Sequence, residues 1–341
     1  MEHDTLARLL VRHAAVTPGQ VVSLLGPPPA QPLLTALFRA VLHAGGHPLL
    51  LIRPDVCDEL LCTEGTDAQR AFVDPLARTE VETTMVAIHV QLAPAQRLEG
   101  DPQRLAQLQH ARRPLVERFL ARGVRWLATV FPTENVAEVC RAMFLDQPDP
   151  VAAWEAQRQR QALLIERLQQ GRELRIVTAA GTDLRLGIAG RRWSNGAGSQ
   201  NMPDGEVYVS PQEDATEGTV VFDVPVIQAG QEIRGAQLTF HQGKVVDASA
   251  AIGGAVLAAI RAEPGGAVVG EFALGCNEAI TRILGHPLLD EKRAGTFHLA
   301  LGGPQSPLHC DLIGDLHHGG RIEIDGEVIS ADGRWCYSVP S

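Results

Sequence analysis

The sequence predicts a two-part fold: a Rossmann-like α/β half with a parallel sheet, followed by an α+β half with mostly antiparallel strands. Short apolar runs alternate with helical patterns in the first half, whereas the second half consists of short strands separated by Gly, Asp and Asn turns. The length of 341 residues also exceeds that of one average domain. We therefore expect an α/β domain over residues 1–171 and an α+β domain over residues 172–341.

In the first half, strands and helices alternate along the chain. Apolar runs predict strands at residues 21–25, 48–52, 85–92 and 125–131. Helical patterns lie at residues 4–15, 31–45, 103–121 and 134–146. This alternation is typical of a parallel sheet covered by helices on both faces. The loop GPPPAQ is too rich in proline to cradle a phosphate, and the sequence has no GxGxxG or GxxxxGK pattern, so we expect no bound nucleotide.

A long helix over residues 149–171, ended by Gly171, is expected to connect the two halves. Beyond it, one further helix is predicted at residues 250–262. Strands are predicted in the segments LRIVTAAGTDLRLGIAG, GTVVFDVPV, GAQLTFHQGKVVDASA, TFHLALGG, LHCDLIGD and GRIEIDGEVI. Short strands joined by tight turns indicate antiparallel sheets, in contrast to the first half.

Composition and charge exclude several classes of partner. The formal net charge is −10, and an acidic surface attracts neither nucleic acid nor an anionic membrane. No apolar run reaches membrane-spanning length, and the N-terminus lacks a signal-peptide pattern. The six cysteines are scattered without CxxC pairs, which is typical of reduced thiols. We expect a soluble cytoplasmic protein that binds neither nucleic acid nor membrane.

The segment SPLHCDLIGD (306–315) places His309 and Asp311 two residues apart in an apolar run. Side chains at this spacing share one face of a strand, with their bases about 7 Å apart. That spacing suits two groups that lean onto one metal ion, or that straddle two ions about 3.5–4 Å apart. Taken alone, the pair is better explained as a core histidine and a turn-capping aspartate. Cys310 between them is expected to face the other way and to pack as a small apolar residue.

Three further candidate ligands lie in the same half of the chain. Glu271 follows Gly270 in the apolar segment AVVGEFAL, where an unpaired glutamate is out of place. Glu206 follows a PDG turn, and His298 lies in the apolar run TFHLAL. Each has an ordinary alternative: a glutamate at a strand edge, a solvated turn carboxylate and a core histidine. Together, two histidines and three carboxylates at strand–turn positions match the inventory of a one- or two-metal hydrolytic site.

At these residues the chain resembles the M29 family of metallo-aminopeptidases, the thermophilic aminopeptidase T and leucyl aminopeptidase group. NMPDGEVYVSP and GEFALG are similar to two family segments that each carry a metal-binding glutamate, here Glu206 and Glu271. DEKRAGTFHLALG and HCD resemble the segments that supply His298, His309 and Asp311. The resemblance implies that these five residues bind divalent ions, two per chain, of Zn, Co or Mn, with Fe as an alternative. It also implies that Glu271 is the general base.

The resemblance further implies a homodimer that removes N-terminal residues from peptides or from small amides. The family places a catalytic tyrosine seven residues after the first ligand histidine, and here Gln305 occupies that position. Only residues 299–308 separate His298 from His309. The chain is therefore identified as a short-loop variant that lacks the family's tyrosine.

Two alternatives stay open on sequence grounds. The dihydroxypyridine dioxygenases have a similar HxD element and bind one Fe(II) through two histidines and one carboxylate, which would here be His298, His309 and Asp311. Those enzymes have histidine where this chain has Glu271, so Glu271 favours the hydrolase. The second alternative is a catalytically degenerate relative that still binds metal.

Overall fold

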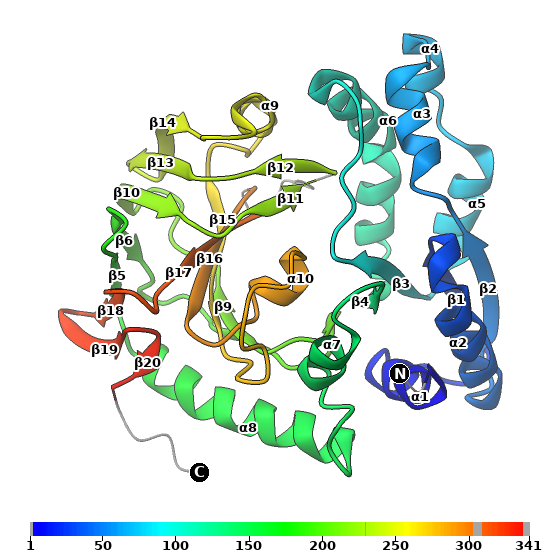
Figure 1. Cartoon of the computed structure of the whole chain (residues 1–341), viewed down its shortest axis with the longest axis horizontal. Coiled ribbons are helices and arrows are strands. Elements are labelled where there is room, and N and C mark those ends of the chain that lie inside the picture. The colour runs from blue at the N-terminus through cyan, green and yellow to red at the C-terminus, as the bar shows by residue number, and fades with distance from the viewer. Residues whose placement is uncertain (1–2, 229, 303–308, 337–341) are drawn as a thin grey trace. The chain divides into compact units, whose positions relative to one another are not determined.

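A computed structural model describes the chain except for residues 1–2, 229, 303–308 and 337–341. The chain groups into two compact units, Met1–Val151 with Gly198–Pro203 and Ala152–Ala197 with Asp204–Ser341. The predicted division into domains 1–171 and 172–341 stays a prediction. The predicted fold class is confirmed, because the first unit contains a parallel sheet and the second contains antiparallel sheets (Figure 1).

The first unit is built on a five-stranded sheet in the order β2-β1-β3-β4-β8, and all its neighbouring strands are parallel. The strands are β1 (Val21–Gly26), β2 (His47–Ile52), β3 (Val86–Ala93), β4 (Arg125–Pro132) and β8 (Asn201–Met202). The first four match the predicted apolar runs. The sequence did not reveal β8, because a two-residue strand is too short to show a periodic pattern.

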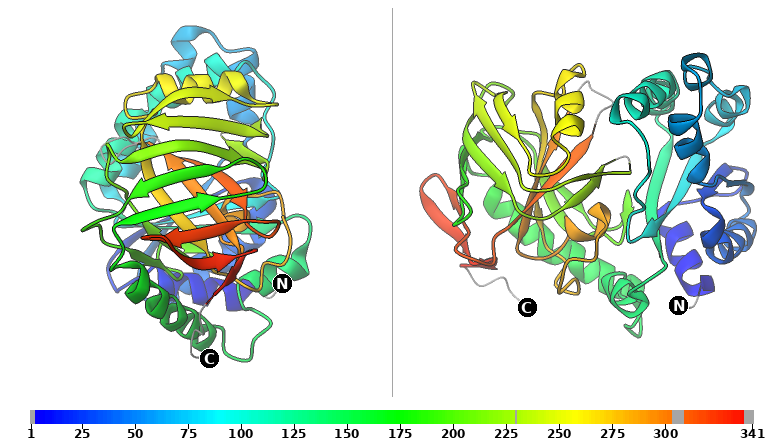
Figure 2. Two further views of the ribbon diagram at one scale, coloured as in Figure 1. Left: turned by 90° about the vertical axis from the view of Figure 1, so that its left-hand side faces the viewer. Right: turned by 45° about the horizontal axis from the view of Figure 1, so that its top comes forward.

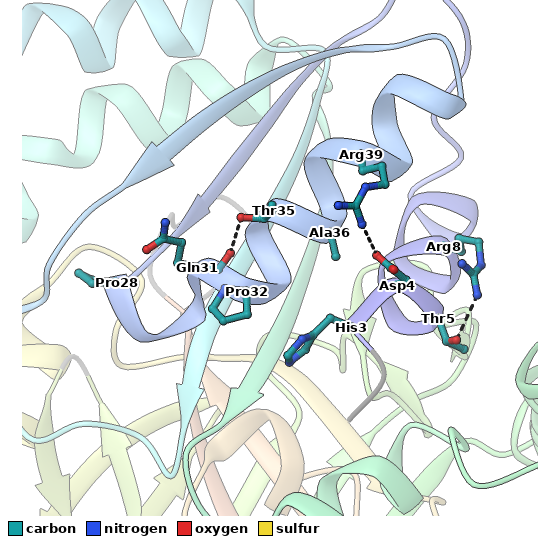
Figure 3. A pocket seen from close by; sticks show the side chains of 10 residues that line it. All are labelled: His3, Asp4, Thr5, Arg8, Pro28, Gln31, Pro32, Thr35, Ala36 and Arg39. Carbon is teal, nitrogen blue, oxygen red and sulfur yellow. Dashed lines mark hydrogen bonds and ion pairs between the residues drawn. The ribbon is translucent and has the colours of Figure 1, made fainter.

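The helices of the first unit are α1 (His3–His13), α2 (Gln31–His43), α3 (Val56–Thr63), α4 (Asp67–Arg70), α5 (Pro75–Thr83), α6 (Pro102–Ala121) and α7 (Val136–Ala142). The GPPPAQ segment forms a short 3-10 helix, Pro28–Ala30, that leads into α2. A pocket of about 870 Å³ lies between α1 and α2 (Figure 3). Its one carboxylate among the lining residues, Asp4, forms an ion pair of 2.8 Å with Arg39. None of the predicted metal ligands lines this pocket.

The second unit contains two large sheets. The eight-stranded sheet has the order β14-β13-β10-β6-β5-β18-β19-β20, and its strands are β5 (Glu173–Val177), β6 (Asp183–Gly187), β10 (Thr216–Phe222), β13 (Ala236–His241), β14 (Lys244–Ser249), β18 (Arg321–Ile324), β19 (Glu327–Ala331) and β20 (Arg334–Trp335). The five-stranded sheet has the order β17-β16-β15-β9-β7, with β7 (Ser194–Gly196), β9 (Glu206–Val209), β15 (Val269–Gly275), β16 (Thr296–Leu301) and β17 (Cys310–Asp315). The left view of Figure 2 shows the first sheet in front of the second.

The remaining elements of this unit are a two-stranded ribbon and three helices. The ribbon pairs β11 (Val226–Gln228) with β12 (Gln231–Ile233), and the helices are α8 (Pro150–Leu168), α9 (Gly254–Ala262) and α10 (Pro287–Asp290). The predicted helices 149–171 and 250–262 correspond to α8 and α9. No helix in the described part of the chain is long and apolar enough to cross a membrane.

The main core of the second unit lies between its two large sheets. Apolar side chains of both sheets belong to one buried cluster, and the Phe222 and Phe297 ring centroids are 6.2 Å apart. Along β16, Phe297, Leu299 and Leu301 belong to this core, so His298 and Ala300 point to the opposite face. Cys310 also belongs to the core, as the sequence predicted. One face of the five-stranded sheet is therefore used for packing, and its other face is left for polar side chains.

Replacement of Phe297 by alanine should destabilise the second unit strongly. Its ring is fully buried and lies over Gly314, where an added Cβ would come within 2.3 Å of it. Loss of a buried aromatic ring leaves a cavity, so we expect the free energy of unfolding to fall by about 3–5 kcal/mol. Chemical denaturation measures this change. Val246→Ala on β14, which is 56% exposed, is the control, and an equal effect of the two substitutions would contradict the assignment of the core.

Candidate metal centre

The polar face of the five-stranded sheet brings three of the predicted ligands together on adjacent strands. Glu271 on β15 lies opposite Ala300 on β16, which in turn lies opposite Asp311 on β17. His298 precedes Ala300 by two residues and so shares its face of the sheet. One donor atom from each of Glu271, His298 and Asp311 lies within 4.8 Å of the others. The pairing of the three strands therefore assembles this cluster.

A β-bulge at Gly270 turns Glu271 toward this face. The pairing of β15 with β16 shifts between Val269 and Glu271, so that Val269 lies opposite Leu301 and Glu271 opposite Ala300. Val269 and Leu301 both belong to the core, whereas Ala300 faces the polar side. A bulge commonly re-aims one side chain of a strand in this way. The sequence showed that this glutamate was out of place in an apolar strand, and the bulge is the physical reason that it is tolerated.

His298 lies at the middle of the cluster. Its Nε2 atom is 3.4 Å from Glu206 Oε2, 3.5 Å from Glu271 Oε1 and 4.0 Å from Asp311 Oδ1. Two donors that share a tetrahedral ion at about 2.1 Å each are themselves about 3.4 Å apart. The His298 side chain is only 1% exposed. The distances from His298 to Glu206 and Glu271 match this spacing, and the distance to Asp311 is longer.

His309 contacts the cluster at Asp311. Its Nε2 atom is 3.0 Å from Asp311 Oδ1, and its side chain is 55% exposed. It therefore lies on the open side of the cluster, in contrast to His298. Gln305, at the position of the family's tyrosine, lies outside the described residues. The structure thus brings all five predicted residues to one region, and their assignment as metal ligands stays a prediction.

Orphaned oxygen atoms show that the site suits a cation. Among the described residues, the buried atoms Glu206 Oε2 and Glu291 Oε2 have no hydrogen-bond partner. A buried polar atom without a partner carries its full desolvation cost. Carboxylate oxygens with imidazole nitrogens are also the donors that Zn, Mn and Fe accept. The residues present therefore fit a divalent metal ion.

The excess of carboxylates raises the pKa of both histidines. Burial by itself would lower the pKa of His298, but Glu271 and Glu206 outweigh burial and raise the pKa to about 9. The carboxylate of Asp311 raises the pKa of His309 to about 10. Burial acts against the ionised form of Asp311, yet the two histidines hold the pKa of Asp311 below its ordinary value. In the metal-free protein, the two protonated imidazoles therefore neutralise part of the negative charge of the carboxylates.

Two charged residues of the site, Glu291 and Lys292, were not predicted from the sequence. The Lys292 Nζ atom lies 2.5 Å from Glu206 Oε1 and 2.7 Å from Glu291 Oε1, and its side chain is 2% exposed. In the sequence both residues belong to the charged run DEKR, in which no pattern marks them as buried. The composition contained one signal, because the chain has only two lysines among its 30 basic residues.

The segment that follows α10 holds Lys292 in this buried position. The Asp290 carboxylate accepts hydrogen bonds from three backbone amides, those of Leu284, Gly285 and His286. The backbone N–H of Asn277 donates to the Lys292 carbonyl oxygen over 2.9 Å. These contacts fix the backbone on both sides of Glu291. The position of the Lys292 ammonium is thus set by the loop.

Two residues outside the sheet centre hold Glu206. Gln161 on α8 is buried, and its Nε2 atom donates to the Glu206 carbonyl oxygen over 2.6 Å. Gly196 on β7 lies opposite Glu206 in the sheet, and a Cβ there would come within 2.8 Å of Glu206 Cγ. Glycine at this position leaves the room that the glutamate side chain occupies. Helix α8 and strand β7 therefore position this carboxylate.

The family model of the thermophilic metalloproteases, M29, matches residues 2–308. This chain belongs to the M29 family. The match ends one residue before His309, so the place of Asp311 rests on the sheet register described above, and that of His309 rests on its contact with Asp311.

Similar proteins of known function cover part of the M29 chain. Aminopeptidase T of Thermus aquaticus is 32% identical over 168 residues, which are 44% of this chain and 41% of that protein. Aminopeptidase 2 of Geobacillus stearothermophilus is 31% identical over 200 residues, which are 52% of this chain and 48% of that protein. The chain thus spans about half the length of the curated relatives that it matches.

Two solved structures resemble the whole M29 chain in fold. Wild-type AmpT from Thermus thermophilus has a TM-score of 0.74 at 21% identity and covers 98% of this chain and 99% of its own. The 2,5-dihydroxypyridine dioxygenase from Pseudomonas putida KT2440 has a TM-score of 0.61 at 16% identity, with coverages of 99% and 97%. At these identities, the likeness shows the fold alone.

Metal binding should release protons. At about pH 7, His298 and His309 are protonated in the metal-free protein because their pKa values lie near 9 and 10, whereas a ligand imidazole is neutral. We therefore expect the apparent affinity for Zn²⁺ to rise with pH until these values are reached. Calorimetric titration in two buffers with different ionisation enthalpies measures the protons released. The same binding enthalpy in both buffers would contradict this prediction.

Enlargement of Ala300 should weaken metal binding while every ligand is retained. Ala300 is fully buried and lies between Glu271 and Asp311 in the strand register, so its methyl group borders the space that the ion requires. We expect Ala300→Val to weaken Zn²⁺ binding at least about tenfold in equilibrium dialysis. The control is Leu299→Ile, whose side chain faces the core. Unchanged affinity of the valine variant would place the ion elsewhere.

Proposed function

We propose that this protein is a metal-dependent aminopeptidase that removes N-terminal residues from peptides or small amides. The convergence of Glu271, His298 and Asp311 on one face of the sheet is the observation that carries this proposal. Membership of the M29 family and the similarity to the two aminopeptidases named above support it. Glu206 and His309 complete the proposed ligand set.

A bound divalent ion lowers the pKa of a water molecule and polarises a carbonyl group. Glu271 is the carboxylate that we assign as general base, because its side chain is 21% exposed whereas that of Glu206 is 6% exposed. A carboxylate open to solvent can accept a proton from the attacking water and donate it to the leaving amine. The Glu206 carboxylate is buried and paired with the Lys292 ammonium, so we assign it as a fixed ligand and not as the base.

The substitution Glu271→Gln tests this assignment. It removes the base but keeps the size of the side chain, so we expect kcat on an aminoacyl anilide to fall about 10²- to 10⁴-fold at saturating metal. The matched control is Glu278→Gln, an exposed glutamate shortly after the same strand, which should keep the wild-type rate. Hydrolysis by the Glu271 variant at the wild-type rate would rule out the role of this residue.

An Fe(II) dioxygenase is the second candidate function. His298, His309 and Asp311 supply two histidines and one carboxylate, which is the ligand set of many mononuclear iron oxygenases, and the dioxygenase fold match supports it. Glu271 beside this set favours the hydrolase, because it adds an acidic group where those enzymes carry histidine. Oxygen consumption with Fe(II) and an aromatic diol would favour the dioxygenase. Peptide hydrolysis that persists without oxygen would argue against it.

We further propose that the metal is Zn, Co or Mn, with Fe as the alternative, since mixed carboxylate and imidazole sites accept each of these ions. A cytoplasmic location is supported by the cysteines, all six of which are unpaired in the described residues. A homodimer is proposed from the family resemblance, and light scattering on the purified protein measures it.

A further inference from the structure

The ammonium group of Lys292 occupies a position between two buried carboxylates. It lies 2.5 Å from Glu206 and 2.7 Å from Glu291, and all three side chains are less than 10% exposed. Distances of this size are those of charge-assisted hydrogen bonds. The site thus contains a covalently attached cation in addition to any metal ion that it binds.

Glu206 connects this ammonium with the His298 cluster. Its Oε1 atom contacts Lys292, whereas its Oε2 atom lies 3.4 Å from His298 Nε2 and has no hydrogen-bond partner among the described residues. In a two-metal site, a carboxylate of this kind bridges two ions. Here one side of the bridge is taken by an ammonium, and the orphaned oxygen faces the side where an ion would bind.

The use of lysine at this position is exceptional for this chain. Of its 30 basic residues, 28 are arginine, and Lys244 is the other lysine. An ammonium is a compact point charge, whereas a guanidinium is a planar fork that requires more room. The lysine ammonium is thus compact enough to lie between the two carboxylates. The other lysine, Lys244 on β14, is exposed.

We propose that the ammonium of Lys292 takes the place of a second metal ion, so that the centre binds one divalent ion, at the cluster of Glu271, His298 and Asp311 that Glu206 and His309 complete. This inference rests on the proposed metal dependence of the enzyme. It departs from the two ions per chain that the family resemblance implies. A second ion would have to displace the ammonium from the Glu206 and Glu291 oxygens or lie beside a like charge.

The number of bound ions tests the inference directly. Chelator-treated protein is dialysed against excess Zn²⁺, and bound zinc is measured by mass spectrometry for the wild type and two variants. We expect about one Zn²⁺ per chain for the wild type and about two for Lys292→Ala, which frees two carboxylates and the space between them. The matched control is Lys244→Ala on β14, an exposed lysine, which should bind as the wild type does.

Two or no zinc ions in the wild type would overturn the inference, as would a folded Lys292→Ala variant that still binds one. If the alanine variant does not fold, Lys292→Gln removes the charge and keeps a donor for one carboxylate, and it should also gain an ion. The wild-type count is decisive in either case.

Peptidase assays on the same samples separate this inference from the proposed function. One bound zinc without hydrolysis supports the ion count and overturns the aminopeptidase. Hydrolysis with two bound zinc ions supports the aminopeptidase and overturns the ion count.

Discussion

The second unit depends on the neutralisation of four carboxylates that are gathered on one face of a sheet. Glu206, Glu271, Glu291 and Asp311 are partly or fully buried there, and ionised groups in such a place are tolerated only when positive charge lies close by. Lys292 provides one positive charge, and the two histidines provide more when they are protonated. A metal ion can replace those protons. Charge balance thus links the fold of this sheet to its chemistry.

Successive residues in the strands of the five-stranded sheet point to opposite faces, one of which packs in the core while the other carries the polar cluster. Apolar residues of β15, β16 and β17 pack against the eight-stranded sheet, while the intervening residues carry the polar cluster. Only one irregularity, the bulge at Gly270, is required to bring Glu271 into phase with His298 and Asp311. Small residues between the ligands keep the space open, as Ala300 shows. A rigid scaffold with one local adjustment is enough to position the ligands.

Most of the fold was predictable because its signals are local. The apolar runs and helical patterns of the first half located four parallel strands, and the short strands beyond α8 indicated antiparallel sheets. His298, His309, Asp311 and Glu271 stood out because each lies in an apolar context, whereas Glu206 follows a turn and was identified as a ligand through the family resemblance. Lys292 was missed because its burial depends on a loop held by distant backbone contacts, and such tertiary contacts leave no periodic trace in the sequence. Strand β8 was missed because it is so short.

The path of the chain around β8 has a consequence for synthesis. After β7 the chain contributes Gly198–Pro203 to the first unit and then resumes the second unit at Asp204. The parallel sheet therefore still lacks its last strand when the ribosome has completed β4, and β4 keeps an unpaired edge until residue 202 has emerged. If the first unit folds early during translation, its sheet has an exposed edge at β4 until β8 is synthesised. During that interval the unpaired edge of β4 can bind a chaperone or pair with the wrong strand.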